Sequence, residues 1–533
     1  MALTIKDFVE QEDSLTLEDI PPEVRKRVND ELQELTGGGD SEPAPPQNPD
    51  ALIVSKNLDG RDGFNEIKPA VDSADSGATI FIEPGTYTED VLVDVDDLTL
   101  AGAEGTPVIR STGTGYQQEG DPVAPLEITG EGVEISDVAV EAVEGEGYGY
   151  GVQISGVAGA SDVTLTNVQV DGSSGFNTGE FGTGVRVRGA PDTVLNGVVV
   201  NGGSDVDYGI RVQEPGTEVL GCTVNNCNRA IDVQSSDQIV QDNTINGITE
   251  SSPGGFYKDP FDDGLEDDTF PSGKGIRVST TPEGSDNTIQ NNDINNCSLG
   301  IEAFGSDSTL SGNDLTGCST GITVANGASN YTISGNTISD GSGRGISVFS
   351  GSTDEHQIEN NTISNQGSGI VLSGSDNNTL SGNTLTDNTY NGIWLNDGAG
   401  SPTGNDIQNN TVSSNGFGSG TPYPGIYLGN ATDTNIENND IDNNAAQGIY
   451  AFESSGTVIN NNTLEDNGEG AGDYVYSGIL LWTVTDTTVT NNTLTENYYR
   501  GIWVENYTDP LTISGNSITL RDSSYQEVVT NAA

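Results

Sequence analysis

The sequence is poor in positive charge and in reactive side chains. Its 533 residues include 18 lysines and arginines against 81 aspartates and glutamates, a single histidine and four cysteines. The resulting formal charge of −63 argues against nucleic acids and anionic membranes as partners, because their phosphates would be repelled. One histidine offers no scaffold for a Ser-His-Asp triad or a histidine-rich metal site. No apolar run of about 18 residues is present, so no membrane insertion is expected.

An export signal is also missing from the start of the chain. Met-Ala-Leu-Thr-Ile-Lys provides neither a basic segment nor an apolar run. A secreted polysaccharide enzyme should carry such a signal, whereas a virion protein leaves the cell by lysis. We therefore expect an extracellular location on a virion surface.

The acidic charge is spread along the whole chain. Its self-repulsion is screened only when the Debye length falls to about 3 Å, near molar salt. The composition therefore resembles that of halophilic, and specifically haloarchaeal, proteins, and it predicts a high-salt environment. The competing interpretation is an acidic surface that binds cations as part of its function.

What the sequence has in abundance is a repeat of about two dozen residues. A Gly-Ile-x-Val phrase recurs, followed by a polar turn and a Thr-Ile-x-x-Asn-x-Ile phrase. Both phrases alternate with period two, as strands do, and show no helical spacing. The fold predicted is all-β, a right-handed parallel β-helix over residues 51–520. The opening positions of the repeat are Gly184, Gly209, Ala230, Gly275, Gly300, Gly321, Gly345, Gly369, Gly392, Gly425, Gly448, Gly478 and Gly501.

An asparagine lies between the two inward residues of almost every second phrase. Stacked coils lie about 4.8 Å apart, so these asparagines are expected to form a ladder of hydrogen-bonded amides. This role is structural. The predicted ladder comprises Asn243, Asn292, Asn313, Asn336, Asn361, Asn383, Asn410, Asn439, Asn462, Asn492 and Asn516.

The segments before the repeat differ in kind. Residues 1–36 contain a short helix with an apolar face and are predicted to be an anchor or oligomerisation segment. Residues 37–50 form a Gly/Pro-rich linker, and residues 521–533 form a C-terminal tail. Residues 64–82 are expected to cap the β-helix with a short amphipathic helix and a strand.

The stretch IFIEPGTYTEDVLV, which begins at Ile80, resembles the opening of the pectate-lyase-like and NosD-like β-helix superfamily. The resemblance covers roughly residues 52–520 and implies the fold rather than the function. The superfamily hosts lyases, hydrolases, epimerases, esterases, adhesins and phage tailspikes. An anchor, a linker and a β-helix in this order most resemble a tailspike or capsid spike of a haloarchaeal virus.

One outward column carries the candidate binding residues. It occupies the position two residues after each opening glycine and is expected to be exposed. Its first half is charged, and its arginines suit carboxylates of acidic glycans, although Asp232 and Glu302 could pair with them across coils. Its second half is aromatic and predicts either sugar stacking or a subunit interface. The candidate glycan- or interface-binding residues are Arg186, Arg211, Arg277, Trp394, Tyr427, Tyr450 and Trp503.

The longest insertion, residues 247–274, is acidic. Asp259, Asp262, Asp263 and Glu266 are the candidate catalytic residues, as an acid and base pair, and Ca²⁺ binding is an alternative. The insertion resembles the Asp-Pro-His motif of mannuronan epimerases but lacks its histidine. No other cofactor or metal is expected. A solvated loop is the structural alternative.

The cysteines and the histidine are predicted to be structural. Cys227, Cys297 and Cys318 should stack in one inward column, and Cys222 should occupy a position of the asparagine ladder. Buried thiols and disulfides between neighbouring coils both remain open. His356 is expected to be solvated in a polar turn.

Three functions follow as hypotheses. The first is a homotrimeric virion appendage that attaches to other virion proteins through residues 1–36 and binds host cell-surface glycans or a glycosylated S-layer. The second is a polysaccharide lyase, glycoside hydrolase or epimerase acting on acidic glycans. The third is a NosD-like or surface-layer repeat protein without activity.

Overall fold

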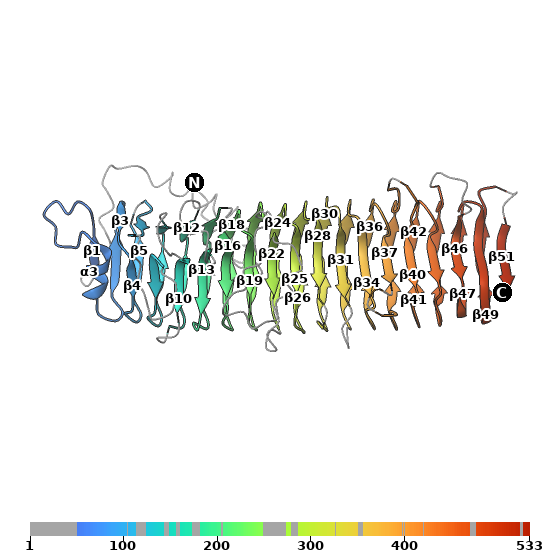
Figure 1. The fold of residues 1–533 in the computed structure, drawn as a ribbon, viewed down its shortest axis with the longest axis horizontal. Coiled ribbons are helices and arrows are strands. Elements are labelled where there is room, and N and C mark those ends of the chain that lie inside the picture. The colour runs from blue at the N-terminus through green and yellow to red at the C-terminus, as the bar shows by residue number, and fades with distance from the viewer. Residues whose placement is uncertain are drawn as a thin grey trace, which may run out of the picture. The chain divides into compact units, whose positions relative to one another are not determined.

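The computed structural model describes residues 51–532 except 104, 113–123, 143–148, 156–159, 173–181, 204–205, 249–272, 279–285, 326, 350–354, 397, 399, 419, 470–475 and 523–525. These residues form a parallel β-helix, which confirms the predicted fold class. Its coils follow one another from α3 to β51 (Figure 1). Each coil contributes one short strand to each of three faces, here called sheets A, B and C.

Sheet A contains the strand that follows the opening phrase of each coil and its polar turn. Its strands are β1 (Leu52–Val54), β2 (Thr79–Ile82), β5 (Thr99–Gly102), β8 (Glu134–Ser136), β11 (Thr164–Thr166), β14 (Val194–Asn196), β17 (Glu218–Leu220), β20 (Ile239–Gln241), β23 (Thr288–Gln290), β26 (Thr309–Ser311), β29 (Thr332–Ser334), β32 (Gln357–Glu359), β35 (Thr379–Ser381), β38 (Asp406–Gln408), β41 (Asn435–Glu437), β44 (Val458–Asn460) and β47 (Thr485–Thr490).

Sheet B follows after a tight turn. Its strands are β3 (Thr86–Thr88), β6 (Val108–Arg110), β9 (Ala139–Glu141), β12 (Gln169–Asp171), β15 (Val199–Asn201), β18 (Thr223–Asn225), β21 (Thr244–Asn246), β24 (Asp293–Asn295), β27 (Asp314–Thr316), β30 (Thr337–Ser339), β33 (Thr362–Ser364), β36 (Thr384–Thr386), β39 (Thr411–Ser413), β42 (Asp440–Asp442), β45 (Thr463–Glu465), β48 (Thr493–Thr495) and β50 (Ser517–Thr519).

Sheet C contains the Gly-Ile-x-Val phrases. Its strands are β4 (Val91–Val93), β7 (Leu126–Ile128), β10 (Tyr150–Ser155), β13 (Gly182–Arg188), β16 (Val206–Val212), β19 (Arg229–Val233), β22 (Lys274–Val278), β25 (Leu299–Ala303), β28 (Thr320–Val324), β31 (Arg344–Phe349), β34 (Ser368–Ser373), β37 (Ile393–Asn396), β40 (Ile426–Gly429), β43 (Ile449–Phe452), β46 (Ser477–Trp482), β49 (Arg500–Ser514) and β51 (Gln526–Ala532). The long β49 continues from sheet C into sheet A.

The core is built from identical positions of successive coils. In sheet A, Ile358 of β32 is in register with Ile333 of β29 and Leu380 of β35, and all three side chains are fully buried. Because side chains alternate across a strand, the flanking threonines, serines and glutamines face outward. Each coil therefore adds one layer of Ile, Val or Leu to a continuous apolar interior.

The predicted asparagine ladder is confirmed at the turn from sheet A to sheet B. Asn383 is fully buried, and its side-chain amide donates to Asn410 Oδ1 at 3.0 Å and to the Ile358 carbonyl at 2.8 Å. The preceding Gly382 has φ +64, the left-handed conformation that a sharp turn requires. At the start of the ladder, the Cys222 backbone N–H donates to Asn243 Oδ1 at 2.8 Å.

Two further columns of buried polar side chains were not predicted from the sequence. At the turn from sheet B to sheet C, Asn388 donates to Asn415 at 2.8 Å, and the column continues through Asn444, Asn467 and Asn497. At the turn from sheet C to sheet A, the Asn378 amide donates to Asn405 at 2.9 Å. All three corners are therefore held by hydrogen bonds along the stacking direction.

His356 belongs to the column at the turn from sheet C to sheet A, and the prediction that it is solvated was wrong. Its side chain is fully buried, and its Nδ1 accepts a hydrogen bond from the Tyr331 backbone N–H at 3.1 Å. Its own backbone N–H donates to Asn378 at 3.1 Å. Burial lowers the pKa of His356 from 6.5 to about 4, so the ring is neutral at pH 7.

The four cysteines lie inside the β-helix as predicted, and two of them are bonded. Cys297 and Cys318, on successive coils, form a disulfide with a Cα–Cα distance of 4.5 Å. Cys222 and Cys227 are free and buried, and burial raises the pKa of each thiol to about 12. Neither free thiol is a nucleophile at neutral pH.

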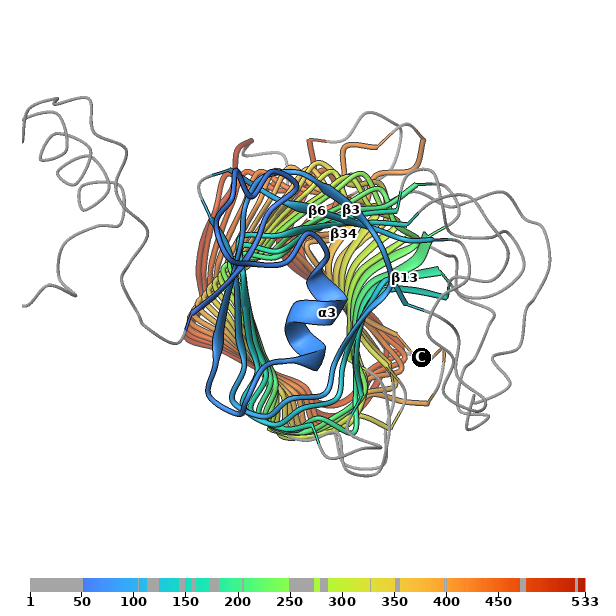
Figure 2. The ribbon, with the colours of Figure 1, turned by 90° about the vertical axis from the view of Figure 1, so that its left-hand side faces the viewer.

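The predicted cap is present at the N-terminal end. The helix α3 (Ile67–Asp72) buries Ile67, Ala70 and Val71, and it lies across the opening of the tube formed by the coils (Figure 2). Both carboxylate oxygens of Glu89 accept hydrogen bonds at 2.8 Å, from the backbone N–H groups of Ile67 and Lys68. A carboxylate at the N-terminus of a helix accepts hydrogen bonds from backbone N–H groups that have no partner within the helix. Its negative charge also interacts favourably with the positive end of the helix dipole.

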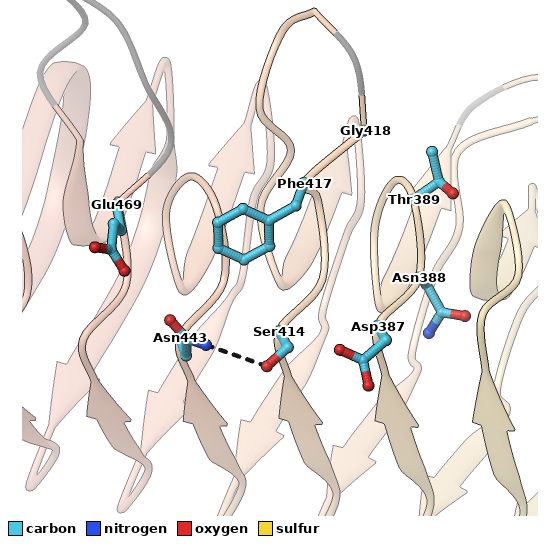
Figure 3. A pocket seen from close by; sticks show the side chains of 8 residues that line it. All are labelled: Asp387, Asn388, Thr389, Ser414, Phe417, Gly418, Asn443 and Glu469. Carbon is cyan, nitrogen blue, oxygen red and sulfur yellow. Dashed lines mark hydrogen bonds between the residues drawn. The ribbon is translucent and has the colours of Figure 1, made fainter.

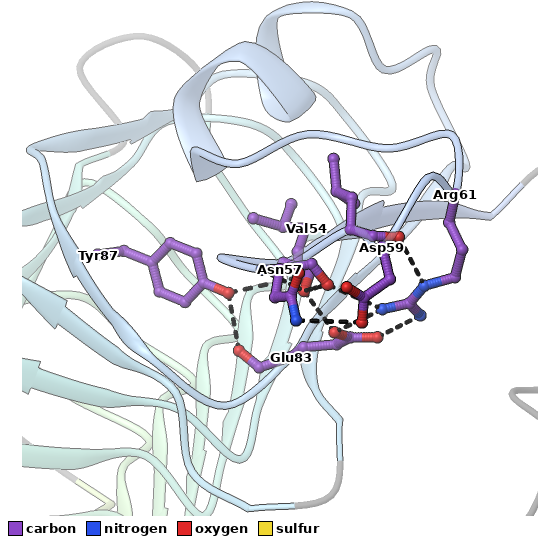
Figure 4. Close-up of polar contacts among 8 residues, drawn as sticks. Val54, Asn57, Asp59, Arg61, Glu83 and Tyr87 are labelled. Carbon is purple, nitrogen blue, oxygen red and sulfur yellow. Dashed lines mark hydrogen bonds and ion pairs between the residues drawn. The ribbon is translucent and has the colours of Figure 1, made fainter.

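A polar network fixes the segment between β1 and α3 (Figure 4). Arg61 contacts both carboxylate oxygens of Glu83, at 2.6 and 3.0 Å, and the Ser55 hydroxyl donates to the same carboxylate. Tyr87 is fully buried and its hydroxyl donates to the Glu83 carbonyl at 2.8 Å. The hydrogen bonds from Arg61 and Ser55 to the carboxylate lower the pKa of Glu83.

The C-terminal end differs from the prediction. β51 lies within residues 521–533, which were predicted to be a tail, and it pairs in parallel with β49. Sheet C therefore extends one strand beyond the last repeat. The predicted anchor at 1–36 and the linker up to residue 50 lie outside the described residues. Within the described part of the chain, no helix combines the length and apolarity that a membrane crossing needs.

Candidate functional site

The outward column of sheet C is continuous in the structure. Register pairs Arg186 with Arg211, Arg277 with Glu302, Trp394 with Tyr427, and Tyr450 with Leu480. The order read from the sequence is thus confirmed as one line of side chains across the coils. Its two halves have different surroundings.

The charged half is buried apart from Arg211, whose side chain is 12% exposed, whereas the sequence predicted an exposed line. Arg186 and Arg277 are 3% and 4% exposed, and Asp232 and Glu302 are 0% and 1% exposed. Burying such charges is tolerated only when they are paired. The repeat pattern reports which way a side chain points from the sheet but not what lies over it.

The buried charges pair across coils, which confirms the structural alternative. Asp232 lies between Arg211, at 3.4 Å, and Arg277, at 3.6 Å. Glu302 contacts Arg277 at 3.3 Å and the Lys274 ammonium at 2.6 Å. Burial lowers the pKa of Lys274, and the Glu302 carboxylate opposes that shift.

Aromatic rings complete the surroundings of these cations. The Arg211 and Arg229 guanidinium groups lie 4.6 and 5.2 Å from the centre of the Tyr208 ring. Arg186 lies 4.8 Å from the ring centre of Tyr150 and donates to its hydroxyl. Lys274, Arg229 and these tyrosines were not predicted as site residues, because they lie three positions before the column that the repeat defines.

The aromatic half is partly open to solvent. Trp394, Tyr427, Tyr450 and Trp503 are half-buried. Tyr427 and Tyr450 meet edge to face with ring centres 5.3 Å apart, and burial together with Tyr427 and Glu453 raises the pKa of Tyr450 to about 12. The Arg500 guanidinium lies 4.0 Å from the centre of the Trp503 ring. Tyr450 therefore keeps its proton at neutral pH and can donate a hydrogen bond.

The two tryptophans share an unusual feature. The indole nitrogens of Trp394 and Trp503 are buried and have no hydrogen-bond partner among the described residues. A buried donor without an acceptor costs about 1–3 kcal/mol. Both indole nitrogens are covered by the protein, so these donors do not face solvent.

A second group of rings lies at the turn from sheet B to sheet C in the same coils. Phe417 and Tyr390 are 50% and 43% exposed, which is unusual for such large apolar side chains. Tyr390 packs edge to face against Tyr423 with ring centres 5.0 Å apart. Phe417 borders a shallow pocket of about 530 Å³ (Figure 3). Sequence reasoning missed Phe417, because it lies in an insertion outside the repeat.

The candidate catalytic residues Asp259, Asp262, Asp263 and Glu266 lie outside the described residues, as does the calcium alternative that depended on them. Elsewhere in the described ranges, no three His, Cys, Asp or Glu side chains gather as metal ligands.

Comparisons with known proteins agree on the fold. Residues 265–365 and 350–518 match the family described as right handed beta helix region. Residues 127–308 match the family described as periplasmic copper-binding protein (NosD). The copper named in that description finds no ligand set among the described residues. No curated protein matches the chain in sequence.

Similar solved structures include both a virion protein and carbohydrate-active enzymes. The Dettilon tailspike protein is 17% identical over 78% of this chain and 72% of its own, with a TM-score of 0.42. The periplasmic alginate epimerase AlgG is 13% identical over 74% of this chain and 77% of its own, with a TM-score of 0.38. Pectate lyase Pel9A is 16% identical over 66% and 81%, with a TM-score of 0.36. At these identities the likeness concerns the fold alone.

Proposed function

We propose that this protein, whose described residues form a parallel β-helix and whose residues 265–518 match the right handed beta helix region, is a recognition protein for cell-surface glycans. The observation that carries this proposal is the aromatic half of the sheet C column. Trp394, Tyr427 and Tyr450 are half-buried rings one coil apart, and Trp503 follows two coils beyond Tyr450. The rings present an apolar face, and the protonated Tyr450 hydroxyl supplies a hydrogen-bonding group. Sugars offer the complementary combination of apolar ring faces and hydroxyl oxygens.

Within this function we place the protein on a virion, as a tailspike-like or capsid-spike appendage of a halophilic archaeal virus. Residues 1–36 join it to other virion proteins, and three copies form the appendage. The charge of −63 supports a high-salt setting, because such a surface repels itself strongly in dilute buffer. Host glycans or a glycosylated S-layer are the partners in this arrangement.

The decisive test removes the rings. The double variant Trp394→Ala/Trp503→Ala should weaken binding to host cells or purified surface glycans by roughly tenfold or more, because interface energy concentrates in a few aromatic anchors. Its mass by light scattering at high salt should stay that of the wild type. The control is Trp394→Phe/Trp503→Phe, which keeps two rings and should retain most of the binding. A fall in mass without loss of glycan binding would identify the column as a subunit interface instead.

A second candidate function is supported by the cations of sheet C. Arg186, Arg211, Arg229, Lys274 and Arg277 gather there in a protein that has only 18 basic residues. Although Asp232 and Glu302 already pair with Arg211, Lys274 and Arg277, the gathering of these cations on one face is the observation that favours an enzyme acting on acidic glycans, such as a lyase, hydrolase or epimerase. Incubation with uronate polysaccharides tests it, through new reducing ends, unsaturated products or altered epimer content. Unchanged substrates would exclude this candidate for the polymers used.

A further inference from the structure

The pocket beside Phe417 is a separate site from the sheet C column. It spans successive coils at the turn from sheet B to sheet C. Its lining residues are Asp387, Asn388, Thr389, Ser414, Phe417, Gly418, Asn443 and Glu469. In Figure 3 the Phe417 ring stands over the pocket, with Glu469 on one side and Asp387 on the other. A volume of about 530 Å³ falls within the range of small-ligand sites.

The exposed ring is held by the backbone around it. The Gly416 N–H donates to the Asn388 carbonyl at 2.9 Å, and the Gly418 N–H donates to the Thr389 carbonyl at 3.0 Å. Phe417 is thus fixed on both sides to the preceding coil. An exposed aromatic side chain on such a rigid support is ready to bind, because little conformational entropy is lost on contact.

The floor of the pocket repeats along the coils. Asp387, Ser414 and Asn443 take the same place in three successive coils, with φ of 56°, 55° and 52°. One coil spacing, about 4.8 Å, therefore separates neighbouring side chains. The Asn443 amide donates to the Ser414 hydroxyl at 3.2 Å, which orients the Asn443 carbonyl oxygen as an acceptor.

The lining chemistry selects the class of ligand. It combines an aromatic face with two carboxylates, an amide oxygen and a hydroxyl, and it contains no cation. An anionic ligand would be repelled by Asp387 and Glu469. The two carboxylates lie on opposite sides of the Phe417 ring rather than together, so they do not form a cation site (Figure 3).

We propose that this pocket binds an uncharged oligosaccharide. One sugar ring stacks on Phe417, and its hydroxyls donate hydrogen bonds to Asp387, Asn443 and Glu469. Charged acceptors make these bonds stronger than neutral ones. The site does not depend on the sheet C column, so a protein whose column is a subunit interface would still bind such a sugar here.

The test is titration calorimetry of the full-length protein in about 2 M salt, which screens the repulsion among its acidic side chains. The probes are oligomers of glucose, mannose, galactose and N-acetylglucosamine, each compared with uronate oligomers of similar length. At least one neutral oligomer should bind and the uronates should not. Phe417→Ala should weaken that binding about tenfold, and Phe417→Trp should preserve it. Asp387→Gly, which permits the same φ, should weaken it severalfold.

Two controls make the result decisive. Val528→Ala truncates another exposed apolar side chain, at 43% exposure, and should leave binding unchanged. Binding that persists in Phe417→Ala but is lost in Trp394→Ala/Trp503→Ala would assign the sugar to the sheet C column and overturn the proposal. The proposal is overturned if no neutral oligomer binds, if Phe417→Ala binds as tightly as the wild type, or if that variant loses a subunit by light scattering.

Discussion

Replacing one buried asparagine should weaken the middle of the β-helix far more than replacing its exposed neighbour. Asn383 is fully buried, and its Oδ1 accepts two hydrogen bonds at 3.0 Å, from the backbone N–H and from the side-chain amide of Asn361. In Asn383→Ala both donors lose their acceptor in a place that water cannot reach. At about 1–3 kcal/mol for each buried unsatisfied group, the expected loss is about 2–6 kcal/mol.

The control for this prediction lies on the next coil. Asn409 precedes the ladder residue Asn410, is exposed and has φ 57°. Asn409→Gly removes an exposed amide while allowing the same backbone conformation, so a change below about 0.5 kcal/mol is expected. The pair therefore compares an inward asparagine with an outward one in neighbouring coils.

Hydrogen exchange is the suitable assay, because coils contact mainly their neighbours and can open locally. A loss of 2 kcal/mol corresponds to about thirtyfold faster exchange in the coils around Asn361, Asn383 and Asn410. Urea unfolding followed by tryptophan fluorescence supplies the global value. Equal exchange rates in Asn383→Ala and Asn409→Gly would refute the view that the ladder stabilises the fold.

Three further predictions concern charge. The pKa of His356 in the folded protein, about 4, lies below its ordinary value of 6.5, so the unfolded chain binds the proton at a higher pH than the folded chain. The free energy of unfolding should therefore fall by up to about 3 kcal/mol as the pH drops from 6.5 toward 4. His356→Asn, which matches Asn378 in the same column, should remove that part of the acid sensitivity in urea unfolding; an unchanged pH profile would contradict it. Glu302→Gln leaves Lys274 and Arg277 without that carboxylate and should lower the free energy of unfolding by about 3 kcal/mol. Glu141→Gln, in a half-exposed pair with Arg110, should lower it by less than about 1 kcal/mol. Similar losses in the two variants would show that burial of the pair is unimportant. Lowering salt from about 1 M to about 0.1 M, which lengthens screening from about 3 to 10 Å, should lower the thermal midpoint, and an unchanged midpoint would argue against adaptation to high salt.

The repeat allowed the column of sheet C to be predicted residue by residue but not its environment. The position after each Gly-Ile determined that Arg277 and Trp394 would lie in one line, since period two fixes the face of a strand. Their exposure depends on what lies over that line, and the repeat contains no such information. Arg277 is accordingly buried between Asp232 and Glu302, whereas Trp394 is only half-buried.

Residues outside the regular phrases were the ones misjudged or missed. His356 was assigned to a polar turn because its neighbours in sequence are polar. Its place in the coil instead puts it in the buried column at the turn from sheet C to sheet A, beside Asn378. Phe417 was missed because an insertion carries no periodic signal. Its position depends on backbone bonds from Gly416 and Gly418 to the preceding coil, which no local pattern shows.

The sequence by itself determined the fold, the face of each repeated side chain and the main asparagine ladder. It could do so because identical coils stack on one another, so that residues one repeat apart in the sequence are in contact in the structure. The tertiary structure alone decided which outward side chains are covered, which cysteines are close enough to bond and where the insertions lie. These properties depend on neighbours distant in sequence and on segments that interrupt the repeat. The repeat pattern carries no information about either.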